Sequence, residues 1–203
     1  MSVLNRHNPQ TGRGAVSNPQ GRYESTRGEA ADDGWGILDE PLPPLQTTMQ
    51  VDVTRSIIAR NKSPDISFSQ SINPYRGCEH GCIYCFARPT HAYFNLSSGL
   101  DFETRLFYKP DAAKLLKEEL AAKNYVCSPI ALGTNTDPYQ PVEREYRVTR
   151  QILETLSACN HPATIVTKGA AIIERDVELL ADMASRKLMA VFISITTLDK
   201  NLK

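Results

Sequence analysis

Three cysteines lie close together in residues 76–86, which read RGCEHGCIYCF. Their C-x3-C-x2-C spacing lets one short loop place three thiolates around a compact inorganic core. Gly77 and Gly81 can adopt the positive φ angles that such a tight loop often needs. Thiolates hold iron–sulfur clusters, and a [4Fe–4S] cube ordinarily takes four of them. The three ligands Cys78, Cys82 and Cys85 therefore predict a [4Fe–4S] cluster with one iron left open, as in metal sites that bind substrate.

Two other roles for these cysteines stay open from spacing alone. Three thiolates with His80 or His91 would make a Cys3His structural zinc site, although zinc sites generally show a second ligand pair and none is visible here. The cysteines could also be small buried hydrophobic residues. The remaining two, Cys127 and Cys159, stand alone in the sequence, and Cys159 is interpreted as a core residue of a helix.

Alternating and apolar stretches predict the strands that position the cysteine loop. Residues 65–72 alternate apolar and polar side chains and lead through a turn into the loop. Residues 102–109 form a second alternating stretch. Apolar runs at 128–133, 163–167 and 188–195 predict further, more deeply buried strands.

Three helices are predicted between these strands. Asp111 caps the first helix, and Pro141 stands in the first turn of the second, which residues 160–162 end. A third helix follows the strand at 163–167. Their buried faces are predicted to comprise Leu115, Leu116 and Leu120 in the first, Tyr146, Ile152, Leu153 and Leu156 in the second, and Ile172, Ile173, Val177, Leu180 and Met183 in the third.

Strands that alternate with helices of this length indicate right-handed βαβ crossovers and a parallel sheet. The fold class is therefore α/β. Residues 1–50 are rich in Gly, Pro, Asn, Ser and Arg, and we assign them to a largely disordered leader. Within it, Trp35, Ile37 and Leu38 are candidates for docking onto the folded part. Residues 51–203 form the core.

The overall composition excludes several classes of protein. With 23 basic and 23 acidic residues the formal net charge is zero, which argues against a sequence-independent nucleic-acid binder. No apolar run approaches the roughly 20 residues that cross a bilayer, and the N-terminus has no apolar signal core. Five cysteines are an odd number and fit a reducing, cytoplasmic compartment better than a disulfide framework.

The cysteine motif, with Tyr84 just before its last cysteine, resembles the radical S-adenosylmethionine (SAM) superfamily. Three longer segments of the sequence are similar to the branch related to spore photoproduct lyase: NPYRGCEHGCIYCFARPTHAY, GTNTDPYQPVE and IVTKG. The resemblance runs from about Ser67 to the end of the chain. It implies a partial parallel (β/α)6 barrel, of which four strands are visible, and a chain truncated at its C-terminus.

The resemblance also implies two cofactors, a [4Fe–4S] cluster and SAM, and a set of SAM contacts. The segment 133–137 would receive the SAM amino group, and Lys168 would pair with the SAM carboxylate. Ser194 would contact the ribose or carboxylate, with Thr196 as its neighbour, and Tyr84 would lie near the adenine. The predicted SAM contacts are Tyr84, Gly133, Thr134, Asn135, Thr136, Asp137, Lys168, Ser194 and Thr196.

The activity implied by the resemblance is reductive cleavage of SAM to a 5′-deoxyadenosyl radical that abstracts hydrogen from a substrate. It would need a one-electron reductant of the ferredoxin or flavodoxin type. The substrate is unknown, with nucleic acid one possibility, and Arg76, Arg88, Arg105 and Lys109 are candidates to line an anion-binding groove. Spore photoproduct lyase uses a cysteine near the end of its second strand, where this chain has Thr134. The competing hypothesis is an iron–sulfur or zinc module with a structural or electron-carrying role.

Overall fold

The structure is a computed structural model that describes residues 12–19 and 45–199. Its larger sheet has five strands in the order β2-β3-β6-β7-β8. The strands β3 (Gln70–Ile72), β6 (Ile130–Leu132), β7 (Ala163–Thr167) and β8 (Met189–Ile193) pair in parallel. The short β2 (Ala59–Arg60) is antiparallel to β3. The predicted α/β fold with four parallel strands is confirmed.

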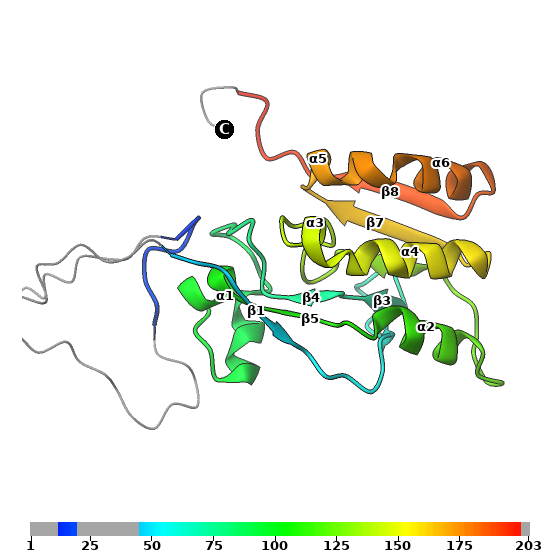
Figure 1. The fold of residues 1–203 in the computed structure, drawn as a ribbon, viewed down its shortest axis with the longest axis horizontal. Coiled ribbons are helices and arrows are strands. Elements are labelled where there is room, and N and C mark those ends of the chain that lie inside the picture. Colours follow the sequence, from blue (N-terminus) through cyan, green and yellow to red (C-terminus); the bar gives the residue numbers. More distant parts are fainter. Residues whose placement is uncertain (1–11, 20–44, 200–203) are drawn as a thin grey trace, which may run out of the picture.

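A smaller sheet has the order β1-β5-β4 and lies beside the cysteine loop (Figure 1). The strand β1 (Thr48–Val51) is parallel to β5 (Arg105–Tyr108), and β4 (Tyr75–Arg76) is antiparallel to β5. The predicted strand at 102–109 is wrong in its first half, because α1 (Leu100–Thr104) occupies it. Phe102 and Glu103 both turn into the interior there, which an alternating strand would not allow.

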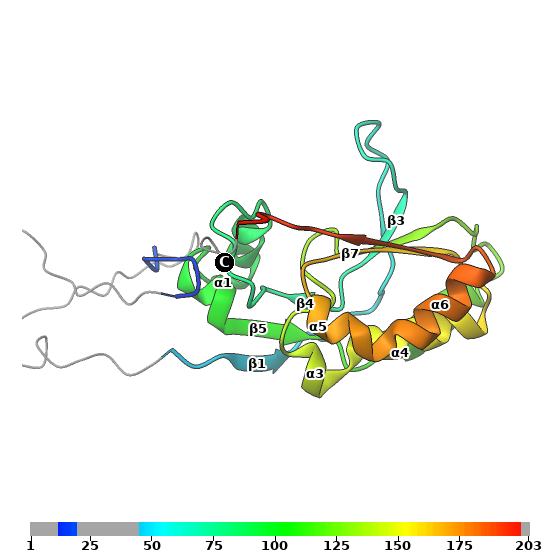
Figure 2. The same cartoon turned by 90° about the horizontal axis from the view of Figure 1, so that it is seen from above.

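The helices that follow the parallel strands lie on one side of the sheet (Figure 2). The helix α2 (Ala112–Leu120) begins directly after Asp111, as predicted, but the Asp111 side chain makes no capping hydrogen bond. The predicted second helix is divided at Arg147, whose φ of 51° separates α3 (Glu143–Tyr146) from α4 (Val148–Ala158). Cys159 follows α4 and is exposed, so its interpretation as a core residue is wrong.

The predicted third helix consists of three pieces: α5 (Ala170–Ile173), the 3₁₀ turn η3 (Glu174–Asp176) and α6 (Val177–Ser185). A 3₁₀ turn has three residues per turn instead of 3.6, so it shifts the helical phase. Val177 is consequently 58% exposed, contrary to the prediction, while Leu180 and Met183 are buried. A second 3₁₀ helix, η2 (Arg88–Phe94), follows the cysteine loop.

One hydrophobic core joins the sheet to its helices. It contains Ile130 and Ile165 from the strands and Leu116, Ile152 and Leu180 from the helices. Strand β8 was predicted over 188–195 as a buried strand, but it is shorter and exposed. It lies at the edge of the sheet and pairs only with β7 among the described residues, and its side chains from Val191 to Ile193 are exposed.

Two described parts of the 1–50 stretch contact the core. They are residues 12–19, which lie next to α1 in Figure 1, and β1. Trp35, Ile37 and Leu38 lie outside the described residues. Within the described ranges, none of the helices has the length and apolar character needed to cross a membrane.

Candidate metal and cofactor site

The carboxyl ends of all four parallel strands carry residues predicted to bind cofactors. The chain leaves β3 at Ile72 and reaches Cys78 six residues later, while Gly133 follows β6 directly. Lys168 and Ser194 likewise follow β7 and β8. Because parallel strands end at the same edge of a sheet, these four segments meet in space, and ligands of α/β sheets bind at such an edge.

A cavity of about 180 Å³ lies where these segments meet. All three predicted metal ligands line it, and so do eight of the nine predicted SAM contacts. Thr196 alone does not: it is exposed beyond β8. The lining consists of Cys78, His80, Cys82, Tyr84, Cys85, Phe86, Gly133, Thr134, Asn135, Thr136, Asp137, Val166, Thr167, Lys168 and Ser194.

The cysteine loop has the backbone conformation that its glycines predict. Gly77 and Gly81 have φ values of 72° and 62°, in the region that glycine adopts without steric cost. Burial is the main reason why the pKa of the Cys78 thiol is raised to about 12. A metal would have to displace that proton, since the thiolate is the ligand form.

The candidate donor set consists of three thiols that line one cavity. Thiolates hold iron–sulfur clusters, each on a separate iron, so the three loop cysteines fit such a cluster. In the described part of the chain, no three His, Cys, Asp or Glu side chains are grouped in a way that could hold a single metal ion.

Lys168 connects the β7 end of the cavity to the cysteine loop. Its Nζ lies 3.2 Å from Cys82 Sγ, donates a hydrogen bond to the Tyr84 hydroxyl and lies 4.7 Å from the centre of the Tyr84 ring. Partial burial would lower the pKa of Lys168, but the hydrogen bonds to Tyr84 and Cys82 raise it above its ordinary value. The ammonium group therefore stays charged at the cavity wall.

Both carboxylate oxygens of Asp137 accept hydrogen bonds from other groups of the protein. Its Oδ1 accepts hydrogen bonds from the Tyr139 amide (2.8 Å) and the Thr167 hydroxyl (2.6 Å). Its Oδ2 accepts one from the Lys168 amide (2.7 Å). His80 Nε2 lies 3.3 Å from Oδ2, near enough for an ion pair but without hydrogen-bond alignment. This carboxylate joins the ends of β6 and β7 to the cysteine loop.

The other residues of the 133–137 segment differ in how free their polar groups are. The Thr136 hydroxyl is buried and donates to the Tyr75 carbonyl, and the Asn135 amide donates to Asn73 Oδ1. Gly133 has a φ of 88°, and a Cβ there would lie 2.0 Å from the Val166 carbonyl oxygen. Backbone carbonyls and the Thr134 and Asn135 side chains therefore remain better placed than Thr136 or Asp137 to receive an ammonium group.

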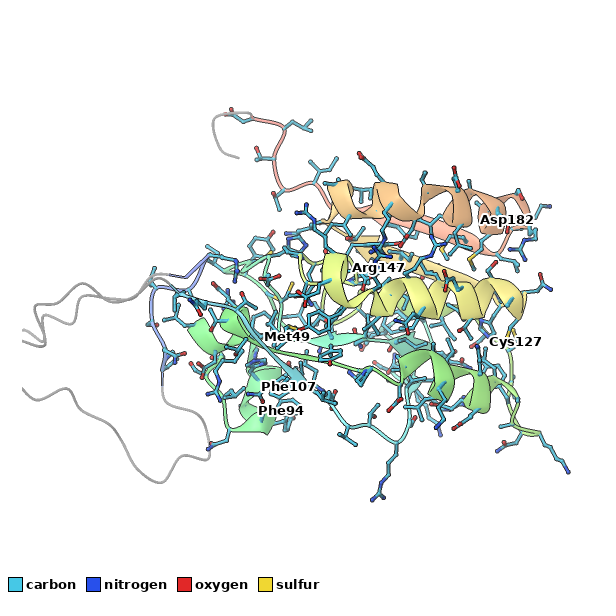
Figure 3. The ribbon with its side chains drawn as sticks, in the orientation of Figure 1. Met49, Phe94, Phe107, Cys127, Arg147 and Asp182 are labelled. Atoms are coloured by element: carbon cyan, nitrogen blue, oxygen red, sulfur yellow. The ribbon has the colours of Figure 1, made fainter. Side chains whose placement is uncertain are left out.

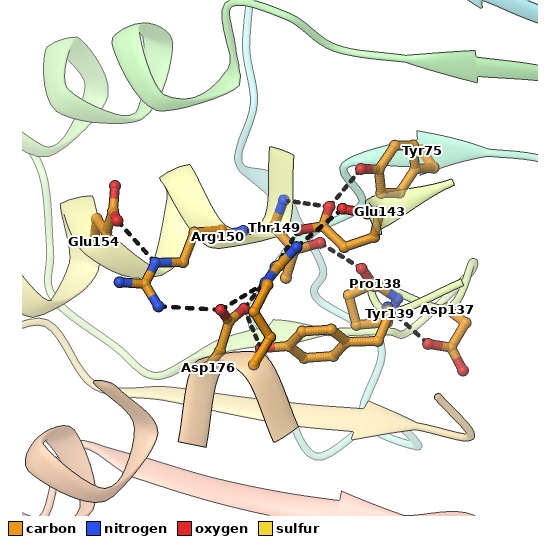
Figure 4. A network of polar contacts seen from close by, with 10 residues as sticks. Tyr75, Asp137, Pro138, Tyr139, Glu143, Thr149, Arg150, Glu154 and Asp176 are labelled. Atoms are coloured by element: carbon orange, nitrogen blue, oxygen red, sulfur yellow. Dashed lines mark hydrogen bonds and ion pairs between the residues drawn. The ribbon is translucent and has the colours of Figure 1, made fainter. Parts of the chain in front are cut away.

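A buried polar network connects the turn after β6 to α3, α4 and η3 (Figure 4). Glu143 and Asp176 are fully buried, and Glu143 accepts hydrogen bonds from the Tyr75 hydroxyl and the Thr149 amide. Arg175 bridges the two carboxylates at 2.8 Å each. The network fixes the turn after β6 and the start of α6 relative to the residues that precede the cysteine loop.

Three of the four basic residues considered for an anion-binding groove are used inside the protein. Asp52 pairs with both Arg76 (2.6 Å) and Lys109 (2.9 Å), and Arg88 pairs with the buried Glu103. Their role in an anion-binding groove stays a prediction, and each of the three is already paired with a carboxylate of the protein. Arg105 alone is exposed.

Cys127 and Cys159 are both exposed and line a separate cavity with His161. Figure 3 labels Cys127 at the end of the molecule opposite the carboxyl ends of the strands. Neither cysteine can serve as the fourth ligand of the loop in this arrangement.

A thiol-lined cavity at the carboxyl ends of parallel strands defines this chain as an α/β protein with a candidate metal and cofactor site. Residues 72–203 match the Radical SAM superfamily, and the chain belongs to that superfamily. Members of this superfamily use a [4Fe–4S] cluster and SAM.

The chain is also similar to proteins that are themselves uncharacterized. One from Mycobacterium tuberculosis and one from Mycobacterium bovis are each 40% identical over 195 residues, covering 87% of this chain and 56% of the relative. One from Methanocaldococcus jannaschii is 26% identical over 132 residues, covering 65% of this chain and 46% of the relative. The chain thus spans little more than half the length of the mycobacterial relatives. No solved structure gives a significant match.

Proposed function

We propose that this chain carries the cluster and SAM site of an enzyme that cleaves SAM reductively and abstracts hydrogen from a substrate. Cys78, Cys82 and Cys85 hold the cluster, and the 133–137 segment, Lys168 and Ser194 hold SAM. The observation that supports this most is the single cavity that all three thiols share with those residues.

When bound, the cluster and SAM would supply the difficult chemistry, which is reductive cleavage of SAM and removal of a hydrogen atom from the substrate. The protein contributes position and charge. Lys168 attracts a carboxylate, and Tyr84, 65% exposed at the cavity mouth, offers a ring face to the adenine. Ser194, whose amide donates to the Thr167 carbonyl at 2.8 Å, is held at the edge of the cavity.

The electron donor in this proposal is a one-electron reductant of the ferredoxin or flavodoxin type. We place the protein in the cytoplasm, because an odd number of cysteines, three of them proposed cluster ligands, suits a reducing compartment. The resemblance to the spore photoproduct lyase branch suggests a nucleic-acid substrate. Arg76, Arg88 and Lys109 are paired with carboxylates of the protein, so they give no evidence for a nucleic-acid substrate. The substrate class therefore stays open in the proposal.

The proposal is tested by anaerobic reconstitution with iron and sulfide, followed by reduction in the presence of SAM. We expect about four irons per chain, a change in the EPR signal of the reduced cluster when SAM is added, and release of 5′-deoxyadenosine. The same assay on a longer form separates the role of this chain from that of the whole protein. A colourless zinc protein, or a cluster whose EPR signal does not change when SAM is added, would favour the structural or electron-carrying module instead.

A further inference from the structure

The N-terminal segment, residues 12–19, packs against the cysteine loop and α1. The Gly12 amide donates to the Ala15 carbonyl at 2.6 Å, which closes a tight turn. The Leu100 amide donates to the Ser17 carbonyl at 3.2 Å, and Asn18 exchanges hydrogen bonds with Asp101. These contacts join residues more than eighty positions apart in the sequence.

Glu103 is the main anchor of the N-terminal segment. Its side chain is fully buried, and its carboxylate accepts the amides of Arg13 (2.7 Å), Gly14 (3.1 Å) and Ala15 (2.8 Å). It also pairs with Arg88, whose guanidinium donates to the Cys82 and Gly81 carbonyls of the cysteine loop. One buried carboxylate therefore connects the N-terminal segment to the backbone that carries the predicted ligands.

The Arg13 side chain makes a second connection to the same loop. Its guanidinium donates to Glu79 Oε1 at 2.9 Å, to the Thr47 hydroxyl at 2.9 Å and to the Glu103 carbonyl at 2.7 Å. Glu79 stands between Cys78 and His80, and its side chain is only 8% exposed. Arg13 thus neutralises a buried carboxylate next to a predicted cluster ligand.

The contact between the two backbones requires glycine on both sides. A Cβ at Gly14 would lie 1.9 Å from the Gly81 carbonyl oxygen, and a Cβ at Gly81 would lie 2.6 Å from Arg13 Cβ. The cysteine loop itself has few internal hydrogen bonds, and those from the Gly81 and Cys85 amides are long, at 3.3 and 3.2 Å. Its conformation therefore depends on what packs against it.

We infer that the N-terminal segment holds the cysteine loop in the conformation that binds the cluster, with Arg13 as a positioning residue. That the loop binds a cluster rests on the proposed function, but the docking of the N-terminal segment on the loop does not. Holding the loop in advance lowers the ordering cost of cluster binding.

Hydrogen exchange of the metal-free full chain tests the docking directly. Gly14→Ala should undock the segment, because its Cβ meets backbone and cannot be accommodated by a side-chain rotation. Val16→Ala is the matched control, since Val16 lies on the same segment and is 63% exposed. We expect the amides of residues 78–85 to exchange at least about tenfold faster in Gly14→Ala and unchanged in Val16→Ala. If the amides of residues 78–85 exchange at the same rate in Gly14→Ala as in wild type, the inference is wrong.

Iron release from reconstituted protein to a chelator provides the second readout. Gly14→Ala and Arg13→Ala should release iron about tenfold faster than wild type, and Arg13→Lys should restore only part of the difference, since lysine lacks the planar fork. Equal release rates in all four proteins would contradict the positioning role. If wild type takes up no iron, the proposed function fails, and the exchange experiment alone decides whether the segment orders the loop.

Discussion

The ammonium nitrogen of Lys168 lies 3.2 Å from the sulfur of Cys82, across the cavity between β7 and the cysteine loop. A lysine that follows one strand thus contacts a predicted metal ligand that follows another. This contact places a positive charge next to a predicted cluster ligand.

Replacing Lys168 should weaken SAM binding without removing iron. A hydrogen bond to a charged group is worth about 1.5–3 kcal/mol, so Lys168→Met should lower SAM affinity about 10- to 100-fold. Equilibrium dialysis with the reconstituted protein measures this, and Lys114→Met, on the exposed face of α2, is the control. Unchanged SAM affinity in Lys168→Met would remove the assigned role.

Replacing Gly133 should displace the segment that follows β6. Alanine at a φ of 88° is strained, and its Cβ would collide with the Val166 carbonyl oxygen, so Gly133→Ala should cost more than about 2 kcal/mol of unfolding free energy. The neighbouring Thr134→Ala loses only a 3.5 Å contact to Asn73 and should cost less than about 1 kcal/mol. Urea denaturation compares the two variants, and equal stabilities would show that this turn is not constrained.

The stability of the fold should fall when the buried network around Asp176 loses one charge. Asp176→Asn leaves Arg175 and Arg150 with one carboxylate fewer in the interior, and removal of one partner of a buried pair costs about 3–5 kcal/mol. Asp182→Asn, which breaks an ion pair with Arg186 on the surface of α6, should cost less than about 1 kcal/mol. Denaturation at pH 7 compares the two variants. If Asp176→Asn loses no more unfolding free energy than Asp182→Asn, the buried ion pairs of Asp176 do not stabilise the fold as proposed.

The same network predicts how stability depends on pH. Burial would raise the pKa of Asp176, but hydrogen bonds and charges from Arg175 and Arg150 lower it below its ordinary value of 3.8. A carboxyl group whose pKa is lower in the folded state stabilises the fold above its unfolded pKa. This stability is lost as the pH falls through the folded value.

Wild type should therefore lose unfolding free energy as the pH falls below about 4, and Asp176→Asn should lose less over the same range. Chemical denaturation at several pH values measures both slopes. Identical slopes in the two proteins would contradict the assignment of a lowered pKa to Asp176.

Periodicity was a good guide wherever local pattern and tertiary packing agree. The strand at 163–167 and the helix after Asp111 are predicted correctly, because β7 buries Ala163 and Ile165 and α2 buries Ala112 and Leu116. The burial of Val177 and the strand at 102–104 are predicted wrongly, because a 3₁₀ turn precedes Val177 and α1 occupies residues 102–104, where Glu103 is buried. Neither cause leaves a periodic signal.

Most of the cavity lining is predicted through the resemblance to the radical SAM superfamily, whose matching residues follow strand ends, and the fold brings these ends together. The supporting contacts could not be predicted. Asp52 and Glu103 are ordinary acidic residues in the sequence, and only the fold buries them beside arginine. The composition of residues 12–19 indicates disorder, while their docking depends on a carboxylate ninety positions away. A sequence pattern that is local cannot report such a partner.

In the proposed function three loop cysteines hold the cluster in one cavity, and the iron content of cysteine variants measures this. Cys78→Ala, Cys82→Ala and Cys85→Ala are each reconstituted anaerobically beside Cys127→Ala and Cys159→Ala, whose thiols are exposed and outside the cavity. We predict that each loop variant loses most of its iron and its EPR response to SAM, while the two control variants keep both. Full iron and an unchanged SAM response in any loop variant would contradict the claim.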